Sequence, residues 1–155
     1  MNIFYLDHDV EKCAKYHVDR HVIKMIVEST QILCSTYYFT GEENYSPYKL
    51  THINHPCCVW ARESLSNWLW LKSLALALCN EYTYRYGKIH KCESIICSLK
   101  IPSLPDLGFT TVKCVMDEEF ITSENPMENY RNYYRFGKKH LWSWKRRNPP
   151  HWLQL

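Results

Sequence analysis

Apolar residues at helical spacing are the feature that most constrains the fold of this chain. Between Asp19 and Tyr37 most positions are apolar, and from Leu65 to Tyr82 apolar residues recur at intervals of three or four. Such spacing is typical of α-helices that turn one face toward a core. The 155 residues contain only four glycines and few alternating stretches. We therefore predict an all-α fold, a single compact helical domain spanning residues 1–155.

Capping residues mark the ends of the predicted helices. Asp9, Asp19 and Asn125 are each placed to cap the start of a helix, and Gly87 is placed to end one. Residues 2–6 are predicted to be extended, and the segment after the last helix to be irregular. The predicted helices cover residues 10–16, 19–37, 56–86 with a break near 64–66, 90–99 and 126–136.

Positive charge is concentrated at the C-terminal end of the chain. Residues 126–155, here called the basic aromatic segment, hold seven Lys or Arg against one acid, which gives +6 and leaves −3 for the other residues. The same segment is rich in Tyr and Trp. Because cations meet phosphates and aromatic rings stack on bases, it predicts a nucleic-acid-binding surface. The candidate binding residues are Arg131, Tyr134, Arg135, Lys138, Lys139, Trp144, Lys145, Arg146 and Arg147.

Polar side chains form a single file along the apolar helix predicted for residues 19–37. His21, Lys24, Glu28 and Gln31 are three or four residues apart, so they share one helix face. Where water is partly excluded, Lys24 and Glu28 are close enough to shift each other's pKa. A buried lysine beside a carboxylate is one way in which enzymes prepare an amine nucleophile. This row of polar side chains is therefore either the solvated face of an amphipathic helix or a catalytic site.

Four histidines suggest a different kind of site. His17 and His21 are four residues apart, and the sequence THINH at residues 51–55 supplies His52 and His55. The first pair lacks the glutamate of the HExxH zinc motif. A histidine-based metal hydrolase is thus a weaker alternative, and the main interpretation expects neither a metal nor another cofactor.

A series of short motifs follows in order along the chain. The helix predicted for residues 19–37 carries Arg20, Lys24, Glu28 and Gln31, and the tyrosine-rich sequence YRNYYRFGKKH occupies residues 130–140. The other motifs are Asp9-x-Glu11-Lys12, Asn54-His55-Pro56 followed by Trp60, and Glu81-Tyr82 with Arg85. In the order and spacing of these motifs, the chain resembles the pyrimidine-dimer DNA glycosylase/AP lyase family over about half of its length.

The resemblance implies a fold, a reaction and a partner. Members of the family are single all-helical domains that remove a damaged base through an imine between an enzyme amine and the sugar C1′. They then cleave the strand at the abasic site and use no metal. In this chain Glu28 takes the position of the carboxylate that stabilises the developing sugar cation and moves protons. The implied partner is double-stranded DNA, and Arg20 and His55 join the candidate binding residues.

The resemblance leaves three candidates for the nucleophilic amine. In the phage enzymes it is the α-amine of a small second residue, which removal of the initiator methionine exposes. Here the second residue is Asn2, whose bulk normally leaves Met1 in place. The amine is therefore that of Met1, that of Asn2 after processing, or the side chain of Lys24. His21, on the same helix face as Lys24, completes the candidate catalytic residues.

Two classes of function follow from these observations. The chain is either an enzyme that acts on DNA bases, or a non-catalytic nucleic-acid-binding protein in which the polar file is structural. No apolar run approaches the roughly 20 residues that span a bilayer, and the N-terminus lacks a secretory signal. We therefore expect an intracellular protein, cytoplasmic or, in a eukaryotic host, nuclear, with its eight cysteines reduced. No feature of the sequence indicates an oligomeric state.

Overall fold

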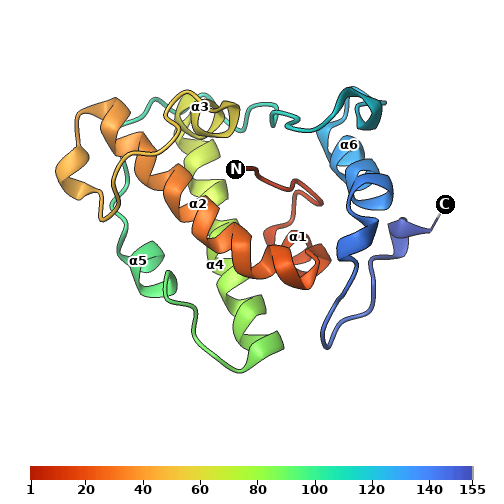
Figure 1. The fold of residues 1–155 in the computed structure, drawn as a ribbon. Coiled ribbons are helices and arrows are strands. Elements are labelled where there is room, and N and C mark those ends of the chain that lie inside the picture. Colours follow the sequence, from red (N-terminus) through yellow and green to blue (C-terminus); the bar gives the residue numbers. More distant parts are fainter. Residues whose placement is uncertain (155) are drawn as a thin grey trace.

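Helices account for the regular structure of residues 1–154, which the computed structural model describes (Figure 1). This part of the chain contains no β-strand, so the prediction of an all-α fold is confirmed. Single helical turns lie at Glu43–Tyr45, Glu118–Phe120, Lys139–Leu141 and His151–Leu153, and a π-helical turn at Tyr133–Gly137. The α-helices are α1 (Val10–Tyr16), α2 (Asp19–Thr40), α3 (Pro56–Glu63), α4 (Leu65–Tyr86), α5 (Glu93–Ser98) and α6 (Pro126–Asn132).

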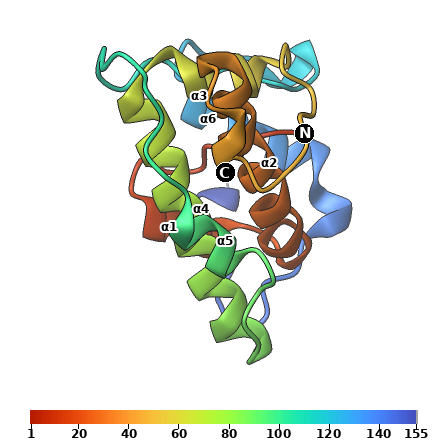
Figure 2. The same cartoon turned by 90° about the vertical axis from the view of Figure 1, so that its left-hand side faces the viewer.

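The two longest helices, α2 and α4, pack against each other and against α3, and α4 also packs against α1. Figure 2 shows α4 running along the length of the molecule beside α5. Trp68 on α4 is fully buried, and its indole Nε1 donates a hydrogen bond to the carbonyl oxygen of Leu33 on α2 (3.1 Å). This bond satisfies the one polar atom of a large apolar side chain, which is why a tryptophan is tolerated at the centre of the core.

Local sequence explains where most helices begin and end. The Asp9 carboxylate accepts hydrogen bonds from the first turn of α1, and the His55 ring does the same for α3, which starts at Pro56. Ser64 is extended and separates α3 from α4, and Gly87 ends α4 in the left-handed conformation that favours glycine. Two helices are shorter than predicted. The helix predicted for residues 90–99 covers only Glu93–Ser98, and the α-helix predicted for residues 126–136 passes into the π-helical turn after Asn132.

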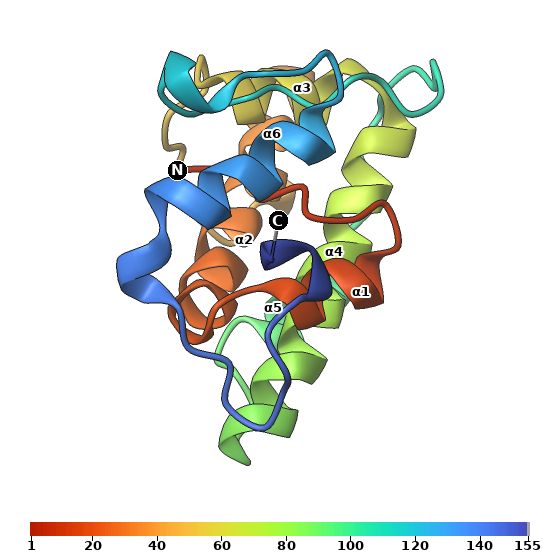
Figure 3. The same cartoon turned by 90° about the vertical axis from the view of Figure 1, so that its right-hand side faces the viewer.

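The N-terminal segment lies between α2 and α6 (Figures 1 and 3). Residues 2–6 are all buried. The ring of Phe4 stacks on that of His21 with 4.2 Å between ring centroids, and it also contacts the rings of Tyr130 and Tyr134. An extended segment thus packs between two helices and brings the N-terminus into contact with residues near the C-terminal end of the chain.

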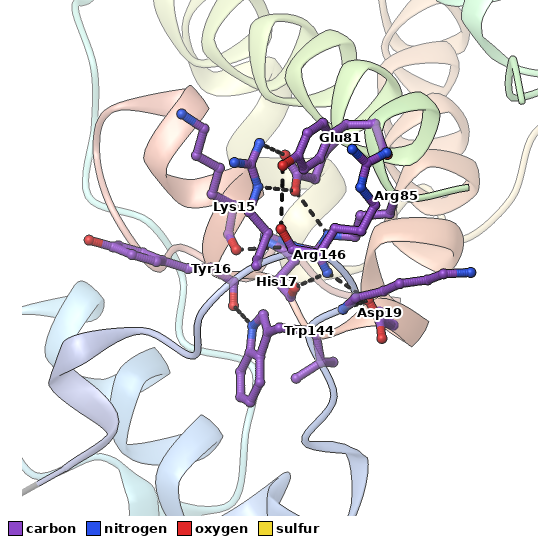
Figure 4. A network of polar contacts seen from close by, with 12 residues as sticks. Lys15, Tyr16, His17, Asp19, Glu81, Arg85, Trp144 and Arg146 are labelled. Atoms are coloured by element: carbon purple, nitrogen blue, oxygen red, sulfur yellow. Dashed lines mark hydrogen bonds and ion pairs between the residues drawn. The ribbon is translucent and has the colours of Figure 1, made fainter. Parts of the chain in front are cut away.

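Buried ion pairs attach the C-terminal segment to the rest of the molecule (Figure 4). The Arg85 side chain is fully buried, and its guanidinium pairs with Glu81 (2.9 Å) and with Asp19 (3.0 Å). Arg147 pairs with the same Glu81 carboxylate (2.8 Å). The Asp19 carboxylate also accepts hydrogen bonds from the Ser143 hydroxyl (2.6 Å) and from the main-chain nitrogen of Lys145 (2.8 Å).

This network corrects the expectation that Asp19 caps α2. Asp19 is the first residue inside the helix, and the capping position is occupied by Val18, whose side chain makes no capping hydrogen bond. The carboxylate is used by Arg85 and by the C-terminal segment, which lie far away in the sequence. It still places negative charge at the positive end of the helix dipole.

Candidate functional site

A cavity of about 220 Å³ opens between the N-terminal segment, α2 and the turn after α6. The five residues that the sequence marks as candidate catalytic groups, Met1, Asn2, His21, Lys24 and Glu28, all line it. Side chains that sequence reasoning did not assign to the catalytic site complete its wall: Phe4, Met25, Val115, Tyr133 and Lys138.

Glu28 is the point at which the nitrogen atoms of the cavity meet. Its Oε2 accepts a hydrogen bond from the main-chain N–H of Asn2 at 3.0 Å. Its Oε1 lies 3.8 Å from the α-amine of Met1 and 3.6 Å from Nζ of Lys24. The Glu28 side chain is only 12% exposed, so these charges interact with reduced screening by water.

The two amines have different surroundings. The Lys24 side chain is 62% exposed, whereas that of Met1 is 6% exposed and contacts Cys58. The prediction of a buried lysine beside a carboxylate is therefore wrong for Lys24, which lies at the rim of the cavity. The buried Met1 side chain holds the α-amine beside Glu28.

Asn2 fixes the position of the N-terminus. Its side-chain amide donates to the carbonyl oxygen of Val115 (2.8 Å), and its Oδ1 accepts hydrogen bonds from the Ile3 N–H (2.8 Å) and the Tyr130 hydroxyl (2.8 Å). With both ends of its amide occupied, Asn2 works as an anchor rather than as a reacting side chain. Its main-chain nitrogen is the atom that contacts Glu28.

His21 forms part of the cavity wall as a neutral imidazole. Its Nδ1 lies 2.7 Å from the Tyr134 hydroxyl, which also accepts a hydrogen bond from the Val18 N–H at 3.3 Å. Among residues 1–154 the Tyr134 hydroxyl has no other group to which it can donate its proton, so it donates to Nδ1 of His21. Nδ1 is therefore the unprotonated nitrogen of the neutral ring, and Nε2 carries the ring proton. Burial, reinforced by nearby positive charges, lowers the pKa of His21 to about 2. The ring is thus an uncharged hydrogen-bond donor throughout the physiological pH range.

Cationic groups surround the cavity. Lys138 lies at its wall with Nζ 4.9 Å from the centroid of the Tyr133 ring, and Arg20 is exposed one turn before Lys24 on α2. His55 is close enough for the N-terminal amine to contribute, after burial, to the lowering of its pKa. The site therefore combines one carboxylate with several positive charges, which suits a substrate that carries phosphate.

The histidines do not assemble into a metal site. Among residues 1–154 no group of three or more His, Cys, Asp or Glu side chains could hold a metal ion. Nδ1 of His17 lies 2.7 Å from the carbonyl oxygen of Cys13, and Nδ1 of His21 is engaged with Tyr134. His55 caps α3 through a hydrogen bond from the Cys57 N–H (3.1 Å). The composite site of His17, His21, His52 and His55 is therefore absent from this part of the chain.

The basic aromatic segment is less available than its composition suggests. Three of its arginines form ion pairs within the fold: Arg131 with Asp7, Arg135 with Glu128, and Arg147 with Glu81. The exposed cations of the segment are Lys139, Lys145 and Arg146.

The aromatic residues of this segment need a similar correction. Tyr134 is completely buried and binds His21, so it is a core residue and not a surface on which a base can stack. Trp144 is half-buried, and its Nε1 donates to the carbonyl oxygen of Tyr16 at 2.9 Å. Tyr133 lines the cavity instead of an outer surface.

The geometry of the cavity fits a limited set of reactions. A primary amine beside a carboxylate can attack an electrophilic carbon and give its proton to that carboxylate. A neutral imidazole N–H stabilises a developing negative charge, and lysines attract an anionic substrate.

Within residues 1–154 no helix is long and apolar enough to span a bilayer. Comparison of the chain with protein-family models, with curated proteins and with solved structures finds no match in any of the three.

Proposed function

We propose that the chain acts on DNA through an amine that forms an imine at C1′ of a nucleotide sugar, with Glu28 as its proton acceptor. The observation that carries this proposal is the convergence of the Met1 α-amine, the Asn2 nitrogen and Lys24 Nζ on one poorly exposed carboxylate. A purely structural ion pair needs only one such nitrogen. The cavity beside them provides space for a substrate.

The α-amine is the nucleophile that the surroundings favour. The buried Met1 side chain fixes it beside Glu28, whereas the Lys24 side chain is exposed and can stay with the phosphates at the rim. If Met1 is removed during processing, the α-amine becomes that of Asn2, whose nitrogen already lies 3.0 Å from Glu28. Either form of the chain presents a primary amine to the same carboxylate.

The reaction follows from this geometry. The neutral amine attacks C1′ and the bond from C1′ to the base breaks, and the departing base takes a proton from water. The nitrogen then loses a proton to Glu28, which passes that proton to the ring oxygen as the sugar opens and the imine forms. Glu28, a carboxylate again, removes a proton from C2′, the 3′ phosphate leaves as an anion, and hydrolysis of the imine by water frees the amine. His21 donates through Nε2 to an oxygen of the opening sugar, and it stays neutral throughout.

Borohydride trapping tests the proposal. The protein is mixed with duplex DNA that carries an abasic site or a pyrimidine dimer, and sodium borohydride reduces any imine to a stable adduct. We expect an adduct that mass spectrometry assigns to the N-terminal residue. Lys24→Arg keeps the positive charge but removes the side-chain amine. Because the proposed nucleophile is the α-amine, this variant still forms the adduct. Glu28→Gln keeps the shape of the side chain and loses at least about 100-fold in adduct formation.

Three outcomes contradict parts of the proposal. An adduct on Lys24 assigns the reaction to the other amine. Full trapping by Glu28→Gln removes the role of the carboxylate. The absence of an adduct with every substrate, together with DNA binding that survives Glu28→Gln and Lys24→Ala, identifies a non-catalytic nucleic-acid-binding protein.

A further inference from the structure

Two connected hollows lie along α2 on the side that carries α5, which faces the reader in Figure 2. Their volumes are about 330 and 560 Å³, and they share Val27 and Tyr48 as lining residues. Val27 and Gln31, which line the hollows, follow Lys24 and Glu28, which line the cavity, by three residues, so the two pairs project from neighbouring parts of the α2 surface. The hollows therefore form a groove beside the candidate active site, and residues of α2 line both.

The charge of this groove is entirely positive. Lys49 lines the first hollow, and Lys88 and Lys91 line the second. None of the three forms an ion pair within residues 1–154, and no acidic side chain lines either hollow. In contrast, the arginines of the basic aromatic segment are mostly neutralised by carboxylates. Within the described residues the groove thus offers three unpaired cations to a partner.

Aromatic and apolar side chains line the same hollows as these lysines. Tyr48 and Tyr82 are half-buried at the wall of the second hollow, and Ile89 is 74% exposed there. Aromatic rings between lysines along a groove are the arrangement that binds unpaired nucleic acid, because the rings stack on bases and the lysines follow the phosphates.

We infer that this groove binds an unpaired nucleic-acid strand and leads it to the candidate active site. Lys49, Lys88 and Lys91 contact phosphates, and Tyr48 and Tyr82 stack on bases. From the groove the strand passes Lys24, and its reacting nucleotide enters the cavity beside Glu28. The choice of reacting nucleotide rests on the proposed function, whereas binding of the strand rests on the groove alone.

Binding of a labelled oligothymidylate, followed by fluorescence anisotropy at several salt concentrations, tests the inference. The groove variant combines Lys49→Gln, Lys88→Gln and Lys91→Gln. Because each lost phosphate contact removes about 0.7 from the slope of log affinity against log salt, we expect the slope to flatten by about 2. The affinity falls by about 100-fold at low salt. The charge-matched control combines Lys12→Gln, Lys15→Gln and Lys100→Gln, three exposed lysines that line neither the groove nor the cavity, and its affinity changes less than about threefold.

Stacking is tested separately from charge. Tyr82→Leu weakens binding of the oligothymidylate by about tenfold, and Tyr82→Phe, which keeps the ring, binds as the parent does. Circular dichroism of every variant shows whether the helices are intact, so a loss of binding is not confused with a loss of fold.

The inference is overturned by any of three results. The first is a control variant that weakens binding as much as the groove variant does. The second is an oligothymidylate affinity that the groove variant leaves unchanged. The third is a dimer that Ile89→Ser converts to a monomer, which identifies a second copy of the chain as the occupant. Failure of borohydride trapping with intact strand binding contradicts the proposed function alone.

Discussion

Lowering the pH from about 7 to 5 is expected to destabilise the folded chain through His17 and His21. Both rings are buried, and burial lowers the pKa of His17 to about 4 and that of His21 to about 2, from 6.5 in the unfolded chain. The stabilising contribution of a ring held neutral is fully present above pH 6.5. As the pH falls below that value the unfolded chain takes up protons that the folded chain does not, so the contribution is lost progressively down to the folded pKa.

The size of the effect follows from these pKa values. At about pH 5 the unfolded form binds nearly one full proton per ring, and each ring then costs about 2 kcal/mol relative to pH 7. Together the two rings remove about 4 kcal/mol, which is a large part of the stability of an ordinary domain. The carboxylates contribute little in this interval, because their ordinary pKa values lie near 4.

Urea denaturation at several pH values measures the loss, and substitution assigns it. The parent chain should lose about 4 kcal/mol of unfolding free energy between pH 7 and 5, and His17→Gln or His21→Gln should each lose about 2 kcal/mol less than the parent. Glutamine preserves a polar group but does not titrate. If both variants follow the parent curve in parallel, the two rings are not held neutral in the fold and the reasoning fails.

Three further predictions concern packing and buried polar contacts. Arg85→Met leaves the Glu81 carboxylate without one of its two arginines and should cost about 3 to 5 kcal/mol in urea denaturation, with little rescue by Arg85→Lys, which cannot contact Glu81, Asp19 and the main-chain carbonyl oxygen of Lys15 at once. Gly137→Ala should cost about 1 to 3 kcal/mol, because a Cβ there would lie 2.6 Å from the Tyr133 ring; unchanged stability would show that the ring moves freely. Tyr134→Phe leaves a buried imidazole nitrogen without its partner and should lower the unfolding free energy by about 1 to 3 kcal/mol, and a neutral or stabilising result would contradict the assigned hydrogen bond.

The helices could be predicted from the sequence because their signals are local. Asp9 caps α1, Ser64 separates α3 from α4, and Gly87 ends α4, and each of these depends on residues within a few positions along the chain. The same reasoning failed for Asp19. Its carboxylate is engaged by Arg85 and by the C-terminal segment, and no local pattern identifies partners so far away.

The sequence predicts which residues form the candidate site, but it does not predict what each of them does there. Helical spacing places Lys24 and Glu28 on one face, but it does not tell which element covers that face. The N-terminal segment covers Glu28 and leaves Lys24 at the rim. In the same way, counting charges in the basic aromatic segment cannot show that Asp7, Glu81 and Glu128 neutralise its arginines.

The anchoring of Asn2 has a consequence for how the protein is made. Its side chain is held by the Tyr130 hydroxyl, 128 positions later in the chain. At a synthesis rate of roughly 5 to 20 residues per second, about 6 to 26 s pass between the two residues leaving the ribosome. During that interval Phe4 lacks the rings of Tyr130, Tyr133 and Tyr134, which contact it in the folded chain. The wall of the cavity can therefore be completed only after Tyr133 and Lys138 have been made.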